Sequence, residues 1–367
     1  MTLTITTQRM NQLEPEELIA AFMQEPPEEF QPWRFDINGE TCFGFQCALD
    51  LFTTVSENVK KLRQQCDPWL PGFVKRLLKP NVLFVGTSVS EYALLPNLAQ
   101  PEALYSAWMD GLRRVDAPFL IVKDIPKQSP LLTERENAFS EALMAYLAQQ
   151  GFLIFSGQAL GYVPICFSSR DEYLKRLSSN RRSNIKRRLK MFSKVAVQEI
   201  HTGSPEMTED LIQFLYVLYL KVYNNSYIHF DKLTLGFFRK VLSCVDNHGV
   251  VFVFRTEQKI IGFSLCFTYQ DFLVEKYIGC QYPDSREHNF YYLSWFYKLD
   301  YCLKHGLKTL IVGWTSPEIK AYLGAEFTQT YHAVYIKNPM LRWLGAKIRF
   351  LFESDRQTLE KLQSSKK

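Results

Sequence analysis

Three side chains in the last third of the chain have the chemistry to move a proton or to balance a developing negative charge. Glu275 and His288 are candidates for a general base, because a carboxylate or a neutral imidazole can take the proton of an attacking amine. Lys320 carries an ammonium group, which can stabilise an oxyanion or a leaving group. Together they predict a catalytic site for transfer of a group to an amine.

Each of these side chains also has a structural explanation. Glu275 lies in an apolar run and could pair with Lys276 or with another cation. His288 could lie on the surface of a loop. Lys320 could be a solvated helix lysine or the partner of a neighbouring glutamate, which would contribute under ~1 kcal/mol. The sequence leaves both explanations open at all three positions.

The segments around these residues predict part of an α/β layer. A helix ends at Gly306, a short apolar strand covers residues 310–312, and a second short helix runs from the cap residue Ser316 to Gly324. Ligands gather at the C-terminal ends of strands in such layers. The residues expected to line a pocket there are Tyr277, Gly279, Tyr282, Tyr292, Trp314, Thr315 and Tyr322, although packing would also explain most of the tyrosines.

A dense basic segment lies between the two halves of the chain. Seven cations fall between residues 181 and 194, and an apolar stripe at helical spacing predicts that they occupy the other faces of a helix. A solvated surface helix is one explanation. The other is an anionic ligand, because like charges repel one another and arginine forks match phosphate oxygens. The residues predicted to bind the phosphates of a donor are Arg181, Arg182, Lys186 and Arg187.

The same order of elements is predicted twice along the chain. A hairpin around Asn38-Gly39 precedes a strand, a helix, a second strand and a second helix, and the segment after residue 249 repeats this order. The predicted elements of the first half are a helix over residues 18–23, a helical segment at 52–78, strands at 82–85, 119–122, 152–155 and 162–167, and helices at 102–114 and 134–149. We expect two α/β layers of like topology, although α/β proteins in general alternate strands and helices.

Composition and absent motifs exclude several classes of protein. The chain has 367 residues, 47% of them hydrophobic, which is enough for two packed cores. Its eight cysteines show no metal-binding spacing, so we expect reduced thiols and no metal. No phosphate-binding P-loop, zinc-protease or serine-hydrolase motif occurs. The first residues lack a signal-peptide pattern and no apolar run is long enough to span a bilayer, so a cytoplasmic location is expected.

The segment YCLKHGLKTLIVGWTSPEIKAYLGAEF resembles the C-terminal part of the GNAT superfamily of acyl-CoA N-acyltransferases. It resembles most the branch that holds the Fem-type peptidyltransferases and the predicted N-acyltransferases of peptidoglycan biosynthesis. Upstream, SSRDEYLKRLSSNRRSNIKRRLKMF is similar to the Arg-rich helix of that branch, and the resemblance covers residues 160–337. The matching positions are Gly306, Gly313, Lys320, Gly324 and Phe327.

This resemblance implies an α/β fold with two tandem GNAT-like mixed-sheet layers and flanking helices. It implies that a backbone N–H between Ile278 and Cys280 stabilises the oxyanion. Lys320 stands where the superfamily places a proton-donating Tyr, and the Fem-like branch has Lys there. Residues 282–289 depart from the glycine-rich loop that cradles coenzyme A. This departure puts coenzyme A binding in question, and the Fem-type branch uses aminoacyl-tRNA instead.

The function expected from these observations is a bacterial-type N-acyltransferase that moves a group other than aminoacyl to an amine. The co-substrate would be acyl-CoA or an acyl carrier, with no tightly bound cofactor and with acyl-carrier protein or tRNA as partners. Two alternatives stay open. One is Fem-type transfer from aminoacyl-tRNA, and the other is a non-catalytic binding or membrane-associated protein on this fold.

The predicted domains are residues 1–32 (helix and linker), 33–167 (first GNAT-like domain), 168–337 (acyltransferase domain) and 338–367 (amphipathic tail). The tail mixes apolar and basic residues from 339 to 353. It either docks on the domain or lies on an anionic membrane surface, which predicts peripheral contact with the inner face of the membrane.

Overall fold

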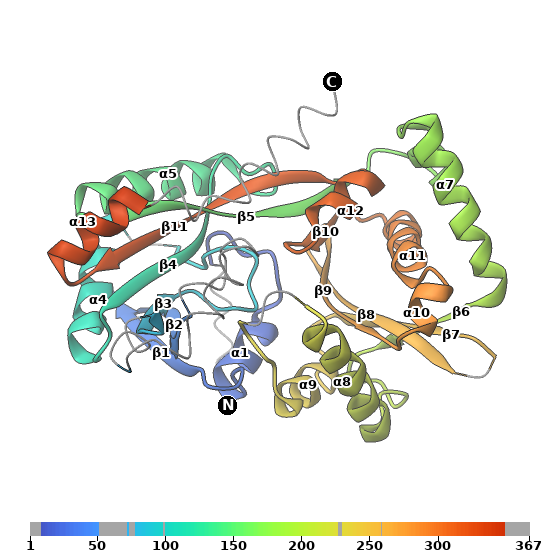
Figure 1. The fold of residues 1–367 in the computed structure, drawn as a ribbon, viewed down its shortest axis with the longest axis horizontal. Helices are drawn as coiled ribbons and strands as arrows, with labels where there is room; N and C mark the ends of the chain where they lie inside the picture. The colour runs from blue at the N-terminus through green and yellow to red at the C-terminus, as the bar shows by residue number, and fades with distance from the viewer. Residues whose placement is uncertain are drawn as a thin grey trace. The chain divides into compact units, whose positions relative to one another are not determined.

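The computed structural model describes residues 9–50, 72, 78–97, 100–226, 230–257 and 259–348. The chain folds into two compact units (Figure 1). Unit 1 comprises Met1–Gln12, Glu28–Ala159 and Thr328–Lys367, and unit 2 comprises Leu13–Pro27 and Leu160–Phe327. The helical segment expected at 52–78 lies almost entirely outside the described residues.

The strands of unit 1 form a mixed sheet in the order β1-β2-β3-β4-β11. Their bounds are β1 Gln31–Ile37, β2 Glu40–Ala48, β3 Asn81–Val85, β4 Phe119–Pro126 and β11 Glu326–Ile336. Asn38 and Gly39 have φ values of 52° and 85°, which suit the two-residue turn predicted between β1 and β2. Of these neighbouring pairs, β3 and β4 run parallel and the others antiparallel.

Helices pack against this sheet through regularly spaced apolar residues. The helices described in unit 1 are α4 Pro101–Arg114, α5 Glu134–Gln149 and α13 Pro339–Ile348. In α4, Leu104, Trp108 and Leu112 recur every four residues and are buried against the strands. Helix α5 begins with a full capping box between Thr133 and Glu136.

The strands of unit 2 continue the order of the same 11-stranded sheet as β5-β10-β9-β8-β7-β6, with β5 entering unit 2 after Ala159. Its strands are β5 Leu153–Pro164, β6 Ala196–His201, β7 Gly249–Arg255, β8 Ile260–Tyr269, β9 Phe272–Cys280 and β10 Thr309–Gly313. Strands β9 and β10 form the parallel pair, and their neighbours are antiparallel. Unit 2 therefore repeats the pattern of unit 1, in which a meander leads into one parallel pair.

Helices pack on both faces of the unit 2 strands (Figure 1). The helices described in unit 2 are α1 Glu16–Gln24, α6 Arg170–Lys175, α7 Ser179–Leu189, α8 Glu209–Asn224, α9 Leu235–Leu242, α10 Asp284–Glu287, α11 Phe290–His305 and α12 Pro317–Leu323, with a 3₁₀ turn, η2, at Lys190–Lys194. Phe252 of β7 packs on Tyr297 of α11, with ring centroids 5.3 Å apart. On the opposite face, Tyr277 of β9 packs on Phe237 of α9, with centroids 6.0 Å apart.

Each unit takes its last strand from the other half of the sequence. β5 follows β4 and α5 in the chain, yet its residues after Ala159 pair with β10 in unit 2. β11 follows β10 and α12, yet its residues from Thr330 onward pair with β4 in unit 1. The two sequence halves therefore exchange their final strands, which confirms the repeated element order and shows that the repeats are not sequential blocks.

One local expectation was wrong, and one strand was missed. The two strands expected at 152–155 and 162–167 are the single strand β5. Ser316 is the N-cap residue of α12 as expected, with φ 56°, although it makes no side-chain cap hydrogen bond. The edge strand β6 was not predicted, because its sequence, AVQEIH, has no clear alternation of apolar and polar residues. Among the described residues, no helix has the length and apolar character that crossing a bilayer requires.

Candidate active site

Strand β9 continues alone where its parallel neighbour ends. β10 pairs with β9 only from Thr309 to Ile311, opposite Phe272 to Val274, whereas β9 runs on to Cys280. β8 pairs with the other edge of β9 along its whole length. The pairing of β9 with β10 therefore ends at Val274, while β9 itself continues for six more residues.

The ammonium group of Lys320 lies close to the point where β10 ends. The side chain is buried, with 4% of its surface exposed, although it belongs to the short helix α12. A Cβ atom added at Gly313, where β10 ends, would lie 3.9 Å from Lys320 Nζ and 4.0 Å from the carbonyl oxygen of Glu275. The ammonium therefore lies at the C-terminal end of β10, close to the point where the pairing of β9 with β10 ends.

Glu275 lies inside the sheet in an ion pair with Lys298 of α11. The exposed fractions of the two side chains are 9% and 2%, and Ser264 of β8 donates a further hydrogen bond of 2.9 Å to Glu275 Oε1. Sequence analysis allowed either a general base or a partner of a cation, and the structure shows the pairing. Lys298 was not identified from the sequence, since a lysine in an apolar helix gives no signal of its partner on a distant strand.

His288 contacts its own helix through one ring nitrogen. Its Nδ1 atom lies 2.9 Å from the carbonyl oxygen of Asp284, and a carbonyl oxygen can only accept a hydrogen bond. In the neutral ring that makes this bond, Nδ1 carries the proton and Nε2 is the acceptor. The imidazole is half-buried at the C-terminal end of α10.

Helix α7 turns two arginines inward onto tyrosine rings. The guanidinium of Arg181 lies 5.5 Å from the ring centroid of Tyr322, and that of Arg188 lies 4.5 Å from Tyr292. Arg188 also donates a hydrogen bond of 2.8 Å to Asn289, the residue before α11. Arg188 was not among the predicted phosphate ligands, although its spacing of seven residues from Arg181 places both on one face of the helix.

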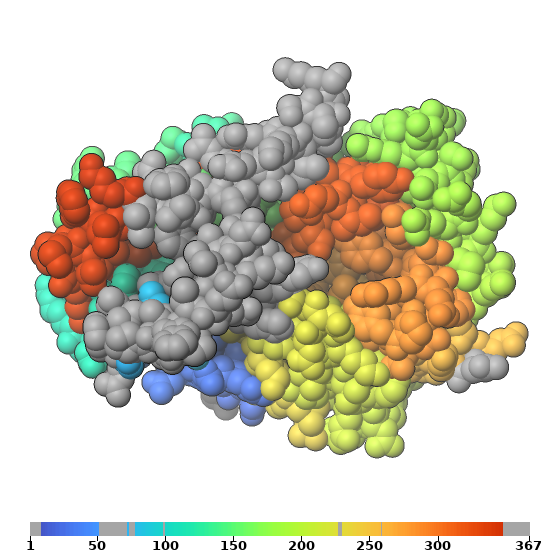
Figure 2. Space-filling view, in the orientation of Figure 1, coloured from blue at the N-terminus to red at the C-terminus, as the bar shows by residue number. Residues whose placement is uncertain are grey.

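The other predicted phosphate ligands lie toward solvent. Lys186 and Arg187 are exposed, Arg182 is half-buried, and Lys186 pairs with Asp171 at 3.2 Å across the surface. Figure 2 shows the α7 segment (bright green) at the molecular surface of the viewed face. The helix therefore has an inner face anchored on the rings of Tyr292 and Tyr322 and an outer basic face open to an anion.

The residues predicted to line a pocket fall into two groups. Tyr292 and Tyr322 contact α7, and burial raises the pKa of Tyr292 above its usual value. Trp314 is half-buried and Thr315 exposed after the end of β10. Burial also raises the pKa of Tyr282 to about 12, and its ring lies 4.9 Å from Arg286.

The second group, Tyr277 and Gly279, is packed against other side chains of the protein. Tyr277 is enclosed by aromatic rings of α8 and α9, including Tyr219 at 6.2 Å between centroids. A Cβ atom added at Gly279 would lie 2.1 Å from Phe263 Cε1 and 2.7 Å from Leu218 Cβ. Gly279 therefore lets α8 and β8 approach β9 closely, which gives it a packing role.

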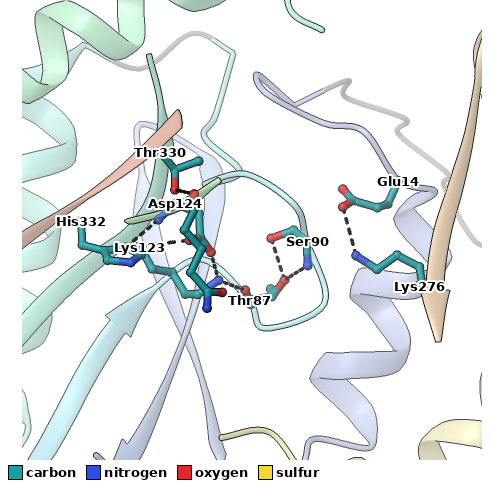
Figure 3. Close-up of polar contacts among 9 residues, drawn as sticks. Glu14, Thr87, Ser90, Lys123, Asp124, Lys276, Thr330 and His332 are labelled. Carbon is teal, nitrogen blue, oxygen red and sulfur yellow. Dashed lines mark hydrogen bonds and ion pairs between the residues drawn. The ribbon is translucent and has the colours of Figure 1, made fainter. Parts of the chain in front are cut away.

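A second buried ion pair ties the N-terminal segment to β9. Glu14 is fully buried and lies 3.4 Å from Lys276, whose side chain is 6% exposed (Figure 3). Glu14 lies just before α1, which packs against α9, where the carboxylate of Glu25 fills the space beside Gly236. Within the segment expected to be a helix and linker, Leu13–Pro27 thus belong to unit 2.

Unit 1 holds a polar cluster where its own parallel strands end (Figure 3). Asp124 has φ 56°, and its backbone N–H donates a hydrogen bond of 3.1 Å to Nδ1 of His332, at an irregularity in β11. Lys123 pairs with the Asp124 carboxylate and donates to the carbonyl oxygen of Thr87 at 3.0 Å. Burial lowers the pKa of His332, which the Asp124 carboxylate opposes. No sequence pattern marked this cluster.

No coenzyme A cradle of the expected kind forms after β9. Residues 282–289 contain no glycine and fold into the short helix α10, whose Asp284 pairs with Lys259 at 2.7 Å. Among the residues that the structure describes, no group of three or more His, Cys, Asp or Glu side chains is arranged to hold a metal ion.

Comparisons with known proteins agree with this architecture. A family model named FemAB-like, described as peptidoglycan biosynthesis/recognition, matches residues 126–366, more than half of the chain. No curated protein matches the chain. Solved structures do match, at sequence identities that inform the fold alone.

Three of these structures cover nearly the whole chain. One is the C-terminal domain of a protein described as a lysylphosphatidylglycerol synthetase from Agrobacterium fabrum, with a TM-score of 0.54, 10% identity, and 93% of this chain and 97% of that chain covered. FemX matches with a TM-score of 0.54, 11% identity and coverage of 92% and 95%. L-PGS from Bacillus licheniformis matches with a TM-score of 0.51, 11% identity and coverage of 93% and 98%. The expected α/β fold of tandem GNAT-like layers is thereby confirmed.

Proposed function

Because the chain belongs to the FemAB-like family, we propose that it transfers an aminoacyl group from aminoacyl-tRNA to an amine. The fold is of the aminoacyl-transferase GNAT type, which supports transfer of an acyl or aminoacyl group. The expectation that the group is not aminoacyl has no support from the family or from the structural neighbours. Aminoacyl-tRNA therefore replaces acyl-CoA as the preferred donor.

The observation that carries the proposal is the position of the buried ammonium of Lys320, at the end of β10 and close to the point where β9 continues beyond its pairing with β10. In α/β layers, ligands gather at the C-terminal ends of the strands, which is where this ammonium lies. Attack on an ester carbonyl creates negative charge on its oxygen. Lys320 Nζ together with a backbone N–H of β9 would stabilise that charge, and such preorganised donors each contribute roughly 3–4 kcal/mol to the transition state.

The reaction needs one proton to move from the amine to the leaving oxygen. The amine nitrogen attacks the carbonyl carbon of the aminoacyl ester and forms a tetrahedral intermediate. His288 Nε2, the unprotonated ring nitrogen, accepts the proton of the amine. The intermediate then collapses with cleavage of the ester C–O bond, and the tRNA hydroxyl leaves with that proton. Glu275 does not exchange protons in this scheme, since its carboxylate pairs with Lys298.

Helix α7 would hold the phosphates of the donor. Its inner arginines are occupied by Tyr322, Tyr292 and Asn289, so they fix the helix in place. The outer cations Arg182, Lys186 and Arg187 would then contact the RNA backbone, which predicts salt-dependent binding. The missing glycine loop and the short helix α10 in its place argue against coenzyme A.

The acceptor class follows from the family description. A peptide precursor of peptidoglycan with a free side-chain amine supplies a nucleophile of the required kind. A lipid-linked amine or an aminoalcohol has the same reacting group, so a panel of acceptor amines must be tested.

The test offers the purified full-length chain a labelled aminoacyl-tRNA or a labelled acyl-CoA, each with a peptidoglycan-precursor peptide bearing a free amine. Mass spectrometry of the peptide reports transfer. We expect transfer from aminoacyl-tRNA, its loss in Lys320→Met, and its retention in Lys304→Met, a matched change at a lysine that is 67% exposed. Transfer from acyl-CoA alone would overturn the choice of donor. Absence of transfer from both donors to every amine in the panel would favour a binding protein.

A further inference from the structure

The short helix α13 in unit 1 turns its apolar residues outward. Met340, Trp343 and Leu344 have exposed fractions of 73%, 64% and 47%. Their spacing of three and four residues puts them on one face of the helix. They account for three of the six large hydrophobic side chains that are exposed among the described residues, so the exposure is concentrated here.

The opposite face of α13 is the one that packs on unit 1. A Cβ atom added at Gly345 would lie 3.2 Å from Leu153 and 3.3 Å from Ile336. Arg342 donates a hydrogen bond of 2.9 Å to the Ile336 carbonyl oxygen and lies 4.3 Å from the ring centroid of Tyr335. The helix is therefore seated by Gly345 and Arg342, and its large apolar side chains are not used for packing.

The first turn of the helix is also secured. Asn338 Oδ1 accepts hydrogen bonds from the backbone N–H groups of Met340 and Leu341, at 2.9 Å and 3.1 Å. These bonds satisfy amide groups that a helix leaves without partners at its start. The exposed stripe is therefore presented by a capped helix, and its direction is set by the contacts on the other face.

The charges around the stripe select its partner. Helix α13 has no acidic residue, and Lys347 lies on the same face at the C-terminal end of the stripe, with its ammonium 5.8 Å from the ring centroid of Trp343. Trp prefers the boundary between apolar chains and water, and Lys can extend its charge to a headgroup while its stem stays apolar. An apolar stripe that ends in a basic residue suits an anionic bilayer surface.

We infer that α13 is an interfacial anchor, with which unit 1 binds the surface of an anionic membrane. Met340, Trp343 and Leu344 enter the boundary between headgroups and acyl chains, and Lys347 contacts lipid phosphates. Figure 2 shows α13 (red) at the molecular surface of the viewed face. The inference uses residues of unit 1 and stands apart from the proposed transfer reaction, which uses residues of unit 2.

Vesicle flotation of the full-length chain tests this anchor. The vesicles contain phosphatidylcholine alone or phosphatidylcholine mixed with phosphatidylglycerol. We expect binding to the mixed vesicles, and a fall in partitioning of about tenfold or more when Met340, Trp343 and Leu344 are replaced by Ser. Lys347→Gln should reduce binding to the mixed vesicles about fivefold and leave weak binding to phosphatidylcholine unchanged.

Two further variants exclude other origins of binding. Replacing the exposed apolar residues of unit 2, Phe214, Val217 and Val245, by Ser matches the number of changes and should leave flotation unchanged. Replacing Arg182, Lys186 and Arg187 by Ser should keep most of the binding, since the basic helix α7 is not the anchor. Flotation lost in that α7 variant but kept in the α13 variant would overturn the inference.

The oligomeric state of the chain distinguishes a membrane from a second copy. A wild-type dimer that becomes a monomer when Met340, Trp343 and Leu344 are replaced would show that the stripe binds another copy, and would overturn the membrane assignment. Failure of the anchor would leave transfer from tRNA in solution unchanged. Failure of transfer would leave flotation unchanged, so the two hypotheses can fail separately.

Discussion

Lys320 is one of the buried lysines of unit 2. Lysines normally keep their ammonium in water, but this one is 4% exposed next to the end of β10. The backbone carbonyl of Glu275 also lies near Gly313, whereas the Glu275 carboxylate pairs with Lys298. At the scale of residues, we therefore propose that Lys320 serves the transfer reaction and that Glu275 holds α11 on β9.

Lys320→Met should lower turnover by roughly a hundredfold or more while the protein stays folded, because Met keeps the apolar stem and removes the charge that stabilises the oxyanion. Lys320→Arg should recover only part of the activity, since a planar guanidinium does not reproduce a point charge. Steady-state kinetics and thermal melting measure the two effects. A Met variant with native turnover would contradict the assignment.

The buried pair of Glu275 and Lys298 should be a stability element. Lys298→Met leaves a buried carboxylate without its cation and should cost about 3–5 kcal/mol of unfolding free energy. The double change with Glu275→Leu should recover most of that loss, because an apolar pair of similar volume needs no compensation. Urea unfolding of both single variants and the double variant measures the coupling. Equal stability of Lys298→Met and wild type would show that the pair is not holding the sheet to α11.

His332 should make stability depend on pH on the acidic side. Burial lowers its pKa in the folded chain, so the neutral ring is the favoured form and the unfolded chain binds the proton more tightly. Its contribution is fully present above the unfolded value of about 6.5 and is lost as pH falls through the lower folded pKa.

The variant His332→Asn keeps an acceptor for the backbone N–H of Asp124 but cannot titrate. The melting temperature of wild type relative to this variant should therefore fall between about pH 7.5 and pH 5. A constant difference over that range would mean that the imidazole is not held in its neutral form.

At the scale of elements, α7 shows how one helix can carry two functions. Its inner face is fixed by Arg181 on Tyr322 and by Arg188 on Tyr292 and Asn289, while its outer face carries cations that do not hold the helix to the sheet. The buried residues Ile185 and Leu189 complete the attachment. Changes on the two faces should therefore be separable by experiment.

Replacing Arg182, Lys186 and Arg187 by Ser should weaken binding of aminoacyl-tRNA and reduce the slope of its salt dependence by about 2–3, because each phosphate contact releases counterions. The melting temperature should hardly change. Arg188→Ser is the matched change on the inner face and should instead lower the melting temperature. Filter binding over a salt series measures the affinity for tRNA and its salt dependence, and thermal melting measures the stability of each variant. Unchanged tRNA affinity in the triple variant would contradict the proposal that α7 binds the donor.

At the scale of the whole molecule, the exchange of final strands makes each unit depend on both halves of the sequence. β4 needs β11 along its edge, and β10 needs the second part of β5. Unit 2 also contains Leu13–Pro27, whose Glu14 is buried against Lys276. A cut between the sequence halves therefore removes a strand from unit 1 and an ion pair from unit 2.

A fragment of residues 1–159 should aggregate, because it exposes the apolar edge strand β4 without β11. A fragment of residues 160–367 should lack activity, because Lys276 loses its buried partner Glu14. Co-expression of both fragments should restore a folded complex. Gel filtration measures aggregation and assembly of the fragments, circular dichroism measures their folding, and the transfer assay measures their activity. An active 160–367 fragment on its own would show that the first half is accessory.

The sequence alone determined most of the elements and the layer pattern. The Asn38-Gly39 turn, the helix stops at Gly306 and Gly324, and the repeated order of hairpin, strands and helices are set by local backbone preferences and by hydrophobic spacing, both of which are readable along the chain. The family and the tandem GNAT-like fold followed from the same segments. Lys320, His288 and the basic helix were also found as candidate residues before their surroundings were known.

Only the tertiary structure decided which of these residues are paired. Glu275 meets Lys298, Lys276 meets Glu14, and Asp124 meets His332 across separations in sequence that no local pattern records. The exchange of β5 and β11 has the same origin, since the partner of a strand depends on which strand edges the whole fold leaves available and not on the sequence of that strand alone. Local sequence fixes what an element is, whereas burial and electrostatics across the whole chain fix which side chains remain available for chemistry.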